Sequence, residues 1–392
     1  MDWTFWLEWF VKAVIMSLVI LTGFAYLTLY ERRALARIQT RIGPNRAGPQ
    51  GLLQPIADAI KLMFKEEVTP GGADKLIFIL APIVTVVPAI ILAAVIPLGT
   101  QFTFPFTGRV IHLYVADVNV GVLYLTAIAS ISVYGIVLAG WSSDNKYALL
   151  GGMRSTAQMI SYELALGLCF VISILLGNSM SLVDIVNAQK GMWFAVLQPV
   201  GALIFMITTL AEVNRAPFDM PEAEQELAAG YHSEYSGMKF ALFFMAEYSK
   251  MIVICMIAAT LYFGGYREFW FLQGTFLSVD AIWHIGAWSF PAWFLGPIYL
   301  LLKVIVLLFF MIWVRATWPR IRYDRLMSFG WKVLLPLAIA IVLVTAVGIL
   351  LAQQLGPIWQ WSIPILSLLV GGVMLLLVNE SLRNKVRKVA HA

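Results

Sequence analysis

The stretch "LIFILAPIVTVVPAIILAAVIP", residues 76–97, decides the fold class of this chain. It contains no charged residue. As a helix it is about 33 Å long, which matches the roughly 30 Å hydrocarbon core of a bilayer. Backbone groups in lipid need internal hydrogen bonds, so the run is predicted to be a membrane-spanning helix. Pro82 and Pro88 predict kinks in this helix and no break into a loop.

Similar runs recur along all 392 residues, of which 60% are hydrophobic and only 12% are charged. We therefore predict an all-α integral membrane protein, a bundle of about nine transmembrane helices plus a short interfacial amphipathic helix. Pro297 implies a further kink. The amino-terminal run lacks a basic region and a cleavage site, so it is expected to be a retained helix. The predicted spans are 9–30, 76–97, 118–141, 156–177, 194–213, 237–264, 294–314, 333–353 and 361–379.

Basic residues predict the orientation of these spans. One set of loops carries nineteen Lys and Arg residues and the alternate set carries three. The positive-inside rule places the first set in the cytoplasm, the amino terminus outside and the carboxy terminus inside. The expected location is a bacterial plasma (inner) membrane. The predicted cytoplasmic segments are 31–74, 142–155, 214–236, 315–332 and the tail from 380.

One of these segments, "GLLQPIADAIKLMFKE" (51–66), has the pattern of an amphipathic helix. Gln54, Asp58, Lys61 and Lys65 follow one another at three- and four-residue steps, and apolar residues fall mostly on the other side. The segment is too short to span a bilayer. It is expected to lie in the membrane interface, either as a simple anchor or as part of a functional site.

The chain offers no visible site for a metal or a redox cofactor. Cys169 and Cys255 both lie within apolar runs, and the four histidines are far apart in the sequence. No thiolate or imidazole ligand spacing is present, and no Gly-rich nucleotide fingerprint follows a strand. We expect no haem, flavin, iron–sulfur cluster or metal on this chain.

Ionisable residues lie within or at the ends of the predicted spans, where each costs on the order of 2.5–3.5 kcal/mol. Such residues indicate a path for charge. Glu247 and Lys250 are three residues apart, so these two could instead form a local ion pair with a structural role, and this alternative to a charge path stays open. Glu163 has no evident partner within its own helix, and proton transfer is the favoured interpretation for it. The predicted polar ladder consists of Glu163, Glu212, Glu247, Lys250 and Lys303.

The predicted cytoplasmic loop "AEVNRAPFDMPEAEQELAAGYHSEYS" (211–236) reverses the charge sign of its side of the membrane, with six carboxylates and one arginine. Part of this charge has a local explanation. Asp219 is a good helix N-cap, Pro221 fits a first turn and Glu222 has capping-box spacing. Gly230 is expected to end this short helix. These roles explain only two or three of the six carboxylates.

Four long motifs in order resemble the family of the membrane H subunit of respiratory complex I, the proton-pumping NADH–quinone oxidoreductase. The resemblance runs from about residue 20 to 353. The motifs are "ERRALARIQTRIGPNRAGPQGLLQPIADAIKLMFKE" (31–66), "GWSSDNKYALLGGMRSTAQMISYELALG" (140–167), "AEVNRAPFDMPEAEQELAAGYHSEYSGMKFALFFMAEY" (211–248) and "IWVRATWPRIRYDRLMSFGWK" (312–332).

The resemblance implies that this chain forms much of a quinone chamber at the junction with a peripheral redox arm. Quinone is then a bound substrate, and the partners are peripheral quinone-site subunits, neighbouring membrane subunits and lipids, without nucleic acid. It implies a core at 1–353, with an acidic loop at 212–236, and an extra span and basic tail at 354–392. The implied chamber and charged-path residues are Glu31, Arg32, Arg215, Asp219, Glu222, Glu224, Glu226 and Arg315.

Under this interpretation the acidic loop responds to quinone reduction and the ladder passes the response into the membrane. Ser130 lies at a position where some bacterial relatives have a carboxylate. The series of ionisable residues in the ladder is therefore expected to differ here from that of those relatives. Two alternatives stay open. A proton-coupled secondary transporter also uses buried Glu and Lys, although no internal repeat is visible. A passive membrane anchor predicts that Glu163 has no role in pumping.

Overall fold

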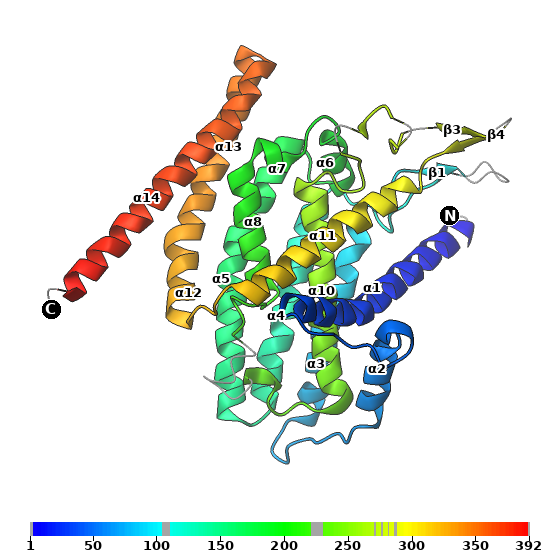
Figure 1. The fold of residues 1–392 in the computed structure, drawn as a ribbon, viewed down its shortest axis with the longest axis vertical. Coiled ribbons are helices and arrows are strands. Elements are labelled where there is room, and N and C mark those ends of the chain that lie inside the picture. The colour runs from blue at the N-terminus through cyan, green and yellow to red at the C-terminus, as the bar shows by residue number, and fades with distance from the viewer. Residues whose placement is uncertain are drawn as a thin grey trace.

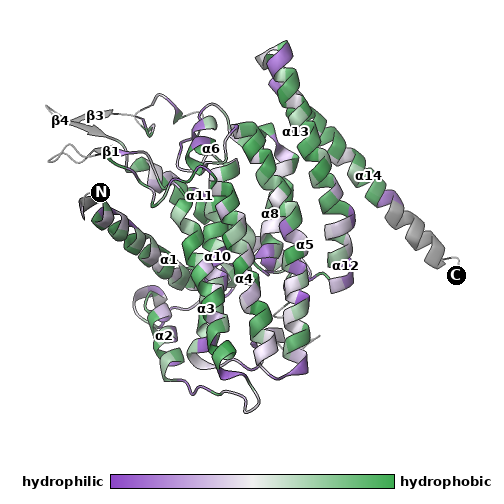
Figure 2. Ribbon diagram, turned by 180° about the vertical axis from the view of Figure 1, so that it is seen from behind, coloured by the Kyte–Doolittle hydropathy of each residue, from purple (hydrophilic) through white to green (hydrophobic). Residues whose placement is uncertain are grey.

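The computed structural model describes residues 3–103, 110–220, 230–269, 272–275, 277–280, 282–285 and 288–390. The described chain is mostly helical, and its strands form only two short hairpins. Eight helical stretches among the described residues are long and apolar enough to cross a membrane, and a shorter apolar helix accompanies them. The prediction of an all-α membrane protein is confirmed. In Figure 2 hydrophobic residues dominate the helices, and hydrophilic residues gather at helix ends and loops.

The elements follow the chain in a simple order. The long helices are α1 Trp3–Ile38, α3 Lys75–Ile91, α4 Gly121–Ser142, α5 Lys146–Gly177, α8 Pro199–Glu212, α10 Gly237–Tyr262, α11 Leu295–Thr317, α13 Leu335–Leu355 and α14 Ser362–Ala390. The short helices are α2 Gln54–Phe64, α6 Leu182–Ala188, α7 Phe194–Leu197 and α12 Tyr323–Phe329. Single turns are η1 Pro49–Gly51, η2 Leu92–Val95, η3 Gly230–His232, the π-helical η5 Gly330–Leu334 and η6 Pro357–Trp361.

The helices run back and forth between two ends of the bundle (Figure 1). We call one the hairpin end, because it carries α6 and the antiparallel hairpins β1–β2 (Phe102–Thr103 with Val110–Ile111) and β3–β4 (Ile282–Ile285 with Trp288–Pro291). The other, the loop end, carries α2, η3 and α12. The N-terminus lies on the side of the hairpin end and the C-terminal end of α14 on the side of α12. Which end faces the cytoplasm stays a prediction.

The centre of the bundle is built from α3, α4, α5, α8 and α10, which pack on one another. Large aromatic side chains fill the space between α5, α8 and α10: Tyr162, Phe205 and Tyr262 are almost completely buried. The Tyr262 hydroxyl donates to the carbonyl of Cys169 over 2.8 Å, which satisfies a polar group in an apolar core. α13 covers α5, and α14 covers α13 and α8.

Most predicted spans correspond to one helix, and the run 194–213 is the exception. It forms two helices, α7 and α8, because Gln198 has a non-helical backbone and Pro199 opens the second helix. α8 has 14 residues and is about 21 Å long, which is too short to cross a bilayer alone. The prediction of one continuous span was therefore wrong here.

The prolines have different effects from one helix to another. Pro82 and Pro88 lie inside α3, which continues through both, as predicted. Pro297 lies in the first turn of α11, where N–H groups have no intrahelical partner, so the helix needs no break there.

The predicted amphipathic helix is confirmed as α2, and none of its residues is buried. On its polar side Asp58 accepts from Gln54 and Lys61 of the same helix and pairs with Arg32 of α1. Partial burial raises the pKa of the Asp58 carboxyl, but the facing Arg32 outweighs burial and the net pKa is lowered. The pair therefore fixes α2 against α1.

Candidate functional site

The site lies toward the loop end, where the turn that follows α8 meets α1, α10 and α11. Gln158 of α5 fixes this turn through three hydrogen bonds. Its fully buried amide donates to the carbonyls of Ala211 (3.0 Å) and Phe218 (2.7 Å) and to the Asn214 side chain (3.2 Å). Asn214 has a left-handed backbone with a φ of 53°, which short polar side chains tolerate. The fixed turn places Arg215 in the interior.

Arg215 is the centre of the first charged cluster. Its Nε lies 2.6 Å from Glu247 Oε1 of α10, and its Nη1 lies 3.3 Å from Glu31 Oε1 of α1. Its guanidinium also lies over the Tyr248 ring, 4.3 Å from the centroid. Burial lowers the pKa of Arg215, but Glu247 and Glu31 raise it more, so the net pKa is above its ordinary value. Arg215 is therefore a permanent buried cation.

Arg315 of α11 joins this cluster by pairing with Glu31. Glu31 thus lies between two arginines while being only 3% exposed. One oxygen of Glu31, Oε2, and two nitrogens of Arg215, Nε and Nη2, are buried without a hydrogen bond of good geometry among the described residues, although Nε is the atom that pairs with Glu247. Unsatisfied buried groups of this kind are costly, and they indicate a place where a polar ligand or water binds.

Asp219 extends the turn toward a second loop. Its carboxylate, 3% exposed, lies 2.9 Å from Arg320 Nη2. The backbone of Ile321 also donates to the Pro217 carbonyl over 3.0 Å. The predicted N-cap role of Asp219 concerns residues 221–229, which lie outside the described part of the chain. Its observed contact instead joins the acidic loop to the loop between α11 and α12.

A second buried ion pair lies deeper in the bundle. Lys250 Nζ of α10 is 2.7 Å from Glu212 Oε1 of α8 and 3.3 Å from Ser132 Oγ of α4. Glu212 is 1% exposed and Lys250 is 7% exposed. The second carboxylate oxygen of Glu212 has no hydrogen-bond partner among the described residues. Glu247 contacts Arg215 in the turn after α8 and Lys250 contacts α8 itself, so the local Glu247–Lys250 pair left open by the sequence is not the arrangement found.

Glu163 of α5 accepts a short hydrogen bond from Ser130 Oγ of α4. It lines a cavity of about 20 Å³ together with Glu212 and Lys250. A second cavity, of about 40 Å³, is lined by the same Glu212 and Lys250 and reaches Glu247 and Asp219. A water needs about 10–15 Å³ of such space, so each cavity has room for at least one water. Glu212 and Lys250 therefore line both water-sized cavities, one of which also touches Asp219 and the other Glu163.

Lys303, the last member of the predicted ladder, lies elsewhere. Its Nζ donates to the carbonyls of Phe263, Gly265 and Arg267 over 2.6–2.8 Å, just beyond the end of α10. Phe263 is thirteen residues after Lys250, so the two ammonium groups are on the order of 20 Å apart along the helix. The structure does not bring Lys303 together with Glu163 and Glu212.

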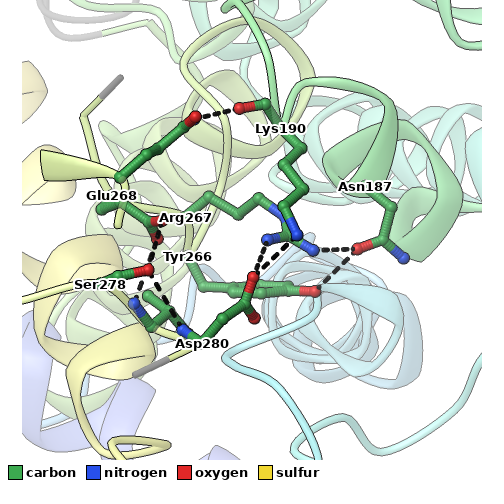
Figure 3. A network of polar contacts seen from close by, with 9 residues as sticks. Asn187, Lys190, Tyr266, Arg267, Glu268, Ser278 and Asp280 are labelled. Carbon is green, nitrogen blue, oxygen red and sulfur yellow. Dashed lines mark hydrogen bonds and ion pairs between the residues drawn. The ribbon is translucent and has the colours of Figure 1, made fainter. Parts of the chain in front are cut away.

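The surroundings of Lys303 form a separate polar network at the hairpin end (Figure 3). Arg267 donates to Asn187 over 2.8 Å and pairs with Asp280, which also pairs with Lys190. Glu268, only 3% exposed, accepts from the Ser278 hydroxyl over 2.9 Å. These contacts join the segment after α10 to α6. Lys303, which donates to the Arg267 carbonyl, therefore belongs to a network that stabilises the hairpin end.

Three predicted residues lie outside the described part of the chain, namely Glu222, Glu224 and Glu226. Arg32 is described, and its half-exposed side chain pairs with Asp58 of α2. Three further residues of the site, Gln158, Ser132 and Tyr248, were not predicted, because in the sequence they resemble ordinary helix residues. Within the described residues, His, Cys, Asp and Glu do not gather into a group of three or more that could hold a metal ion.

Comparison with known proteins identifies the family of this chain. The model of a family described as NADH dehydrogenase matches residues 11–346. The first of two numbered H subunits of NADH-quinone oxidoreductase from Geobacter metallireducens is 50% identical over 335 residues, covering 85% of this chain and 94% of the relative. The second H subunit from Geobacter sulfurreducens is 51% identical with the same coverage of both chains. The H subunit from Thermomicrobium roseum is 48% identical, covering 86% of this chain and 95% of the relative.

Proposed function

We propose a function from one premise: this chain belongs to the NADH dehydrogenase family, and the relatives compared above are H subunits of NADH–quinone oxidoreductase. On this premise it is a membrane subunit of respiratory complex I. It forms much of the quinone chamber and carries the first part of the path that couples quinone reduction to proton translocation. The electrons arrive from redox centres on partner subunits, so the chain contributes to the enzyme without a redox centre of its own.

The observation that carries this proposal is the series of buried and half-buried ionisable residues between the turn 213–220 and Glu163. Two ion pairs, Arg215–Glu247 and Lys250–Glu212, lie in sequence along α10. Both cavities touch Glu212 and Lys250, and one touches Glu163. A buried ion pair is weak evidence for stability, since desolvation offsets much of its Coulomb energy. A series of such pairs beside water-sized cavities is better explained by charge movement.

The chamber is proposed to lie around Glu31, Arg215 and Arg315. Arg215 Nη2 can donate to a carbonyl oxygen of a quinone head, and its fixed charge stabilises negative charge that develops there. The quinone is proposed to enter from the bilayer past α1, α2 and α10. The apolar side of α2 exposes Ile56, Ile60 and Phe64, as expected of a helix in the membrane interface.

Coupling follows from electrostatics. Reduction of the quinone consumes protons and changes the charge beside Arg215, so the distribution of charge between Glu31 and Glu247 changes with it. Glu247 shares a cavity with Glu212 and Lys250, which are proposed to take up or release a proton in response. Glu163 then responds to this change of protonation, and its own charge acts on the neighbouring membrane subunits. Glu222, Glu224 and Glu226 are proposed to supply protons at the entrance, and Asp219 to fasten the loop to Arg320.

The partners are accordingly other complex I subunits: peripheral quinone-site subunits at the loop end and membrane subunits beside the bundle. A bacterial plasma membrane, with the loop end in the cytoplasm, is the proposed location. The counts of Lys and Arg in the loops support this orientation.

The first test is NADH-driven quinone reduction in native membranes after deletion and restoration of the gene. Activity is expected to disappear and return. The alternative, a proton-coupled transporter, predicts unchanged quinone reduction, and that result would refute the proposal.

The second test replaces Glu222, Glu224 and Glu226 by Gln together. We expect an assembled complex with lower quinone-dependent turnover or fewer protons moved per electron. Glu66→Gln, at an exposed position of the same end, is the matched control and should behave as the wild type. A normal ratio of protons to electrons at normal turnover in the triple variant would contradict the acidic-loop role.

A further inference from the structure

We propose that a groove between α1 and the two segments 96–98 and 111–115 binds a phospholipid with a zwitterionic headgroup. We call it the outer groove. It is far from the charged cluster at the loop end, because Lys12 at its rim precedes Glu31 by nineteen residues, about 28 Å along α1. The proposal is therefore independent of the function proposed above.

The position of the groove relative to the bilayer follows from aromatic residues at the start of α1. Trp3, Trp6 and Trp9 are all at least 45% exposed. Exposed tryptophans at the end of a spanning helix mark the level of the lipid headgroups. Figure 1 shows this end of α1 on the side of the β1–β2 hairpin. The groove thus begins at the headgroup level and descends into the leaflet of the hairpin end.

One wall of the groove is a stripe along α1. Leu7, Val11, Ile15 and Val19 follow one another at four-residue steps, so they share one side of the helix. Each is at least 44% exposed, so the described part of the chain leaves the stripe open. From Leu7 to Val19 the stripe is about 18 Å long, and the part beyond Lys12, toward the middle of the membrane, is about 10 Å long. This part of the groove has room for the upper portion of one acyl chain of one leaflet.

The opposite wall is held in place by backbone hydrogen bonds. The Leu98 N–H donates to the Leu113 carbonyl over 2.9 Å, and the Ala116 N–H donates to the Ala94 carbonyl over 3.0 Å. Ile96 is fully buried at the base of this wall. Between the two walls lies a cavity of about 520 Å³ with an almost entirely apolar lining. The groove is therefore formed before any ligand enters, and its interior suits an acyl chain.

The rim supplies polar groups at the headgroup level. Lys12 Nζ lies 2.5 Å from Glu8 Oε1, and both side chains remain about one fifth to one quarter exposed. The exposed His112 stands on the other wall. A cation and an anion side by side complement the phosphate and the ammonium of a zwitterionic headgroup. A purely anionic headgroup would place its phosphate near Glu8 without an ammonium to offset the repulsion.

The test uses the purified complex in lipid nanodiscs that contain a trace of phosphatidylethanolamine with a diazirine on one acyl chain. After irradiation, labelled peptides are identified by mass spectrometry. We expect label on peptides that contain residues 7–19 and 111–115. Ile15→Trp fills the groove and should reduce this label at least fivefold. Val14→Trp adds the same bulk to α1 at a residue that does not line the groove, and should leave the label unchanged.

A second pair of measurements tests the headgroup and does not depend on a bulky substitution. With wild-type complex, the phosphatidylethanolamine probe should label the groove at least threefold more than a phosphatidylglycerol probe with the same chain. Glu8→Gln should abolish that preference. Equal labelling by both probes in the wild type would overturn the zwitterionic assignment. Label that Ile15→Trp leaves intact, or that an excess of a quinone analogue removes, would overturn the lipid site itself.

Discussion

Glu212 and Lys250, 38 residues apart in the chain, form an ion pair of 2.7 Å in which both side chains are almost completely buried. The pair joins α8 to α10 at the boundary between the two cavities. Lys250 also donates to Ser132 of α4, so one ammonium group contacts both α4 and α8 and links them to α10.

Lys250→Met should destabilise the assembled complex, because it leaves the Glu212 carboxylate buried without its cation. The expected loss is about 3–5 kcal/mol, as for other buried pairs broken on one side. Glu212→Gln with Lys250→Met removes both charges and should recover much of the stability, while proton pumping stays low. Thermal denaturation of the purified complex measures the first effect. Asp324→Asn, which breaks an exposed pair with Arg322, is the control and should change stability little.

Ser130→Ala should lower proton pumping without preventing assembly, because Glu163 loses the hydroxyl that orients its carboxylate. A hydrogen bond to a charged group contributes about 1.5–3 kcal/mol, enough to change a proton-transfer rate about tenfold or more. Ser130→Thr keeps the hydroxyl and should restore most of the pumping. Proton uptake by inverted vesicles during NADH oxidation is the measurement. If Ser130→Ala and Glu163→Gln both pump normally, the chain acts as a passive anchor at this position.

Gly151→Ala should displace the acidic loop, because a Cβ on Gly151 of α5 would lie 2.5 Å from Gly230 Cα. Backbone cannot move aside as a flexible side chain can, so the expected destabilisation is about 1–3 kcal/mol. Gly167→Ala in the same helix is the matched control, since its Cβ meets nothing within 4 Å. That control should be neutral or slightly stabilising. Equal stability of the two variants would show that α5 and η3 do not pack as closely as described.

Helix positions were largely predictable from sequence, since apolar runs in a membrane leave the backbone no alternative to helix. The failure at 194–213 has a local cause: Gln198 is fully buried and donates to Thr345 of α13 over 2.6 Å, a tertiary contact that stabilises a non-helical residue. Composition alone gives no sign of that partner.

The ionisable residues of the site were predictable because charges within apolar runs are conspicuous, but their partners were not. Glu247 and Lys250 are neighbours on one helix, yet they contact Arg215 and Glu212 respectively. Sequence spacing describes neighbours within a helix and carries no information about the facing helix. For the same reason Gln158, which holds the turn that carries Arg215, could not be distinguished from other polar residues.

His232 should make the loop end sensitive to acid. Aromatic rings of Tyr231, Phe240 and Phe243 surround it, and burial lowers the pKa of His232 from 6.5 to about 3. The folded state binds fewer protons than the unfolded state between these values, so stability is complete above about pH 6.5 and falls as the pH decreases toward 3. The slope contributed by one such group is at most about 1.4 kcal/mol per pH unit.

His232→Phe keeps an aromatic ring in this space and removes the titration. Its stability should therefore depend less on pH than that of the wild type between pH 4 and 6.5. Limited proteolysis near η3 at a series of pH values is the measurement. Parallel pH dependence of the two proteins would mean that His232 is hydrated and protonated in the folded chain.

Lys303→Met distinguishes a structural role of Lys303 from a role in the proton path. The ammonium of Lys303 satisfies three carbonyl oxygens just beyond the end of α10, and its replacement leaves these acceptors buried and unpaired. Each such group costs about 1–3 kcal/mol, so the variant should assemble poorly or denature at a clearly lower temperature. Lys303→Arg keeps the charge and the donors and should recover part of the stability. A stable Lys303→Met complex that reduces quinone normally but fails to pump would instead make Lys303 a member of the proton path.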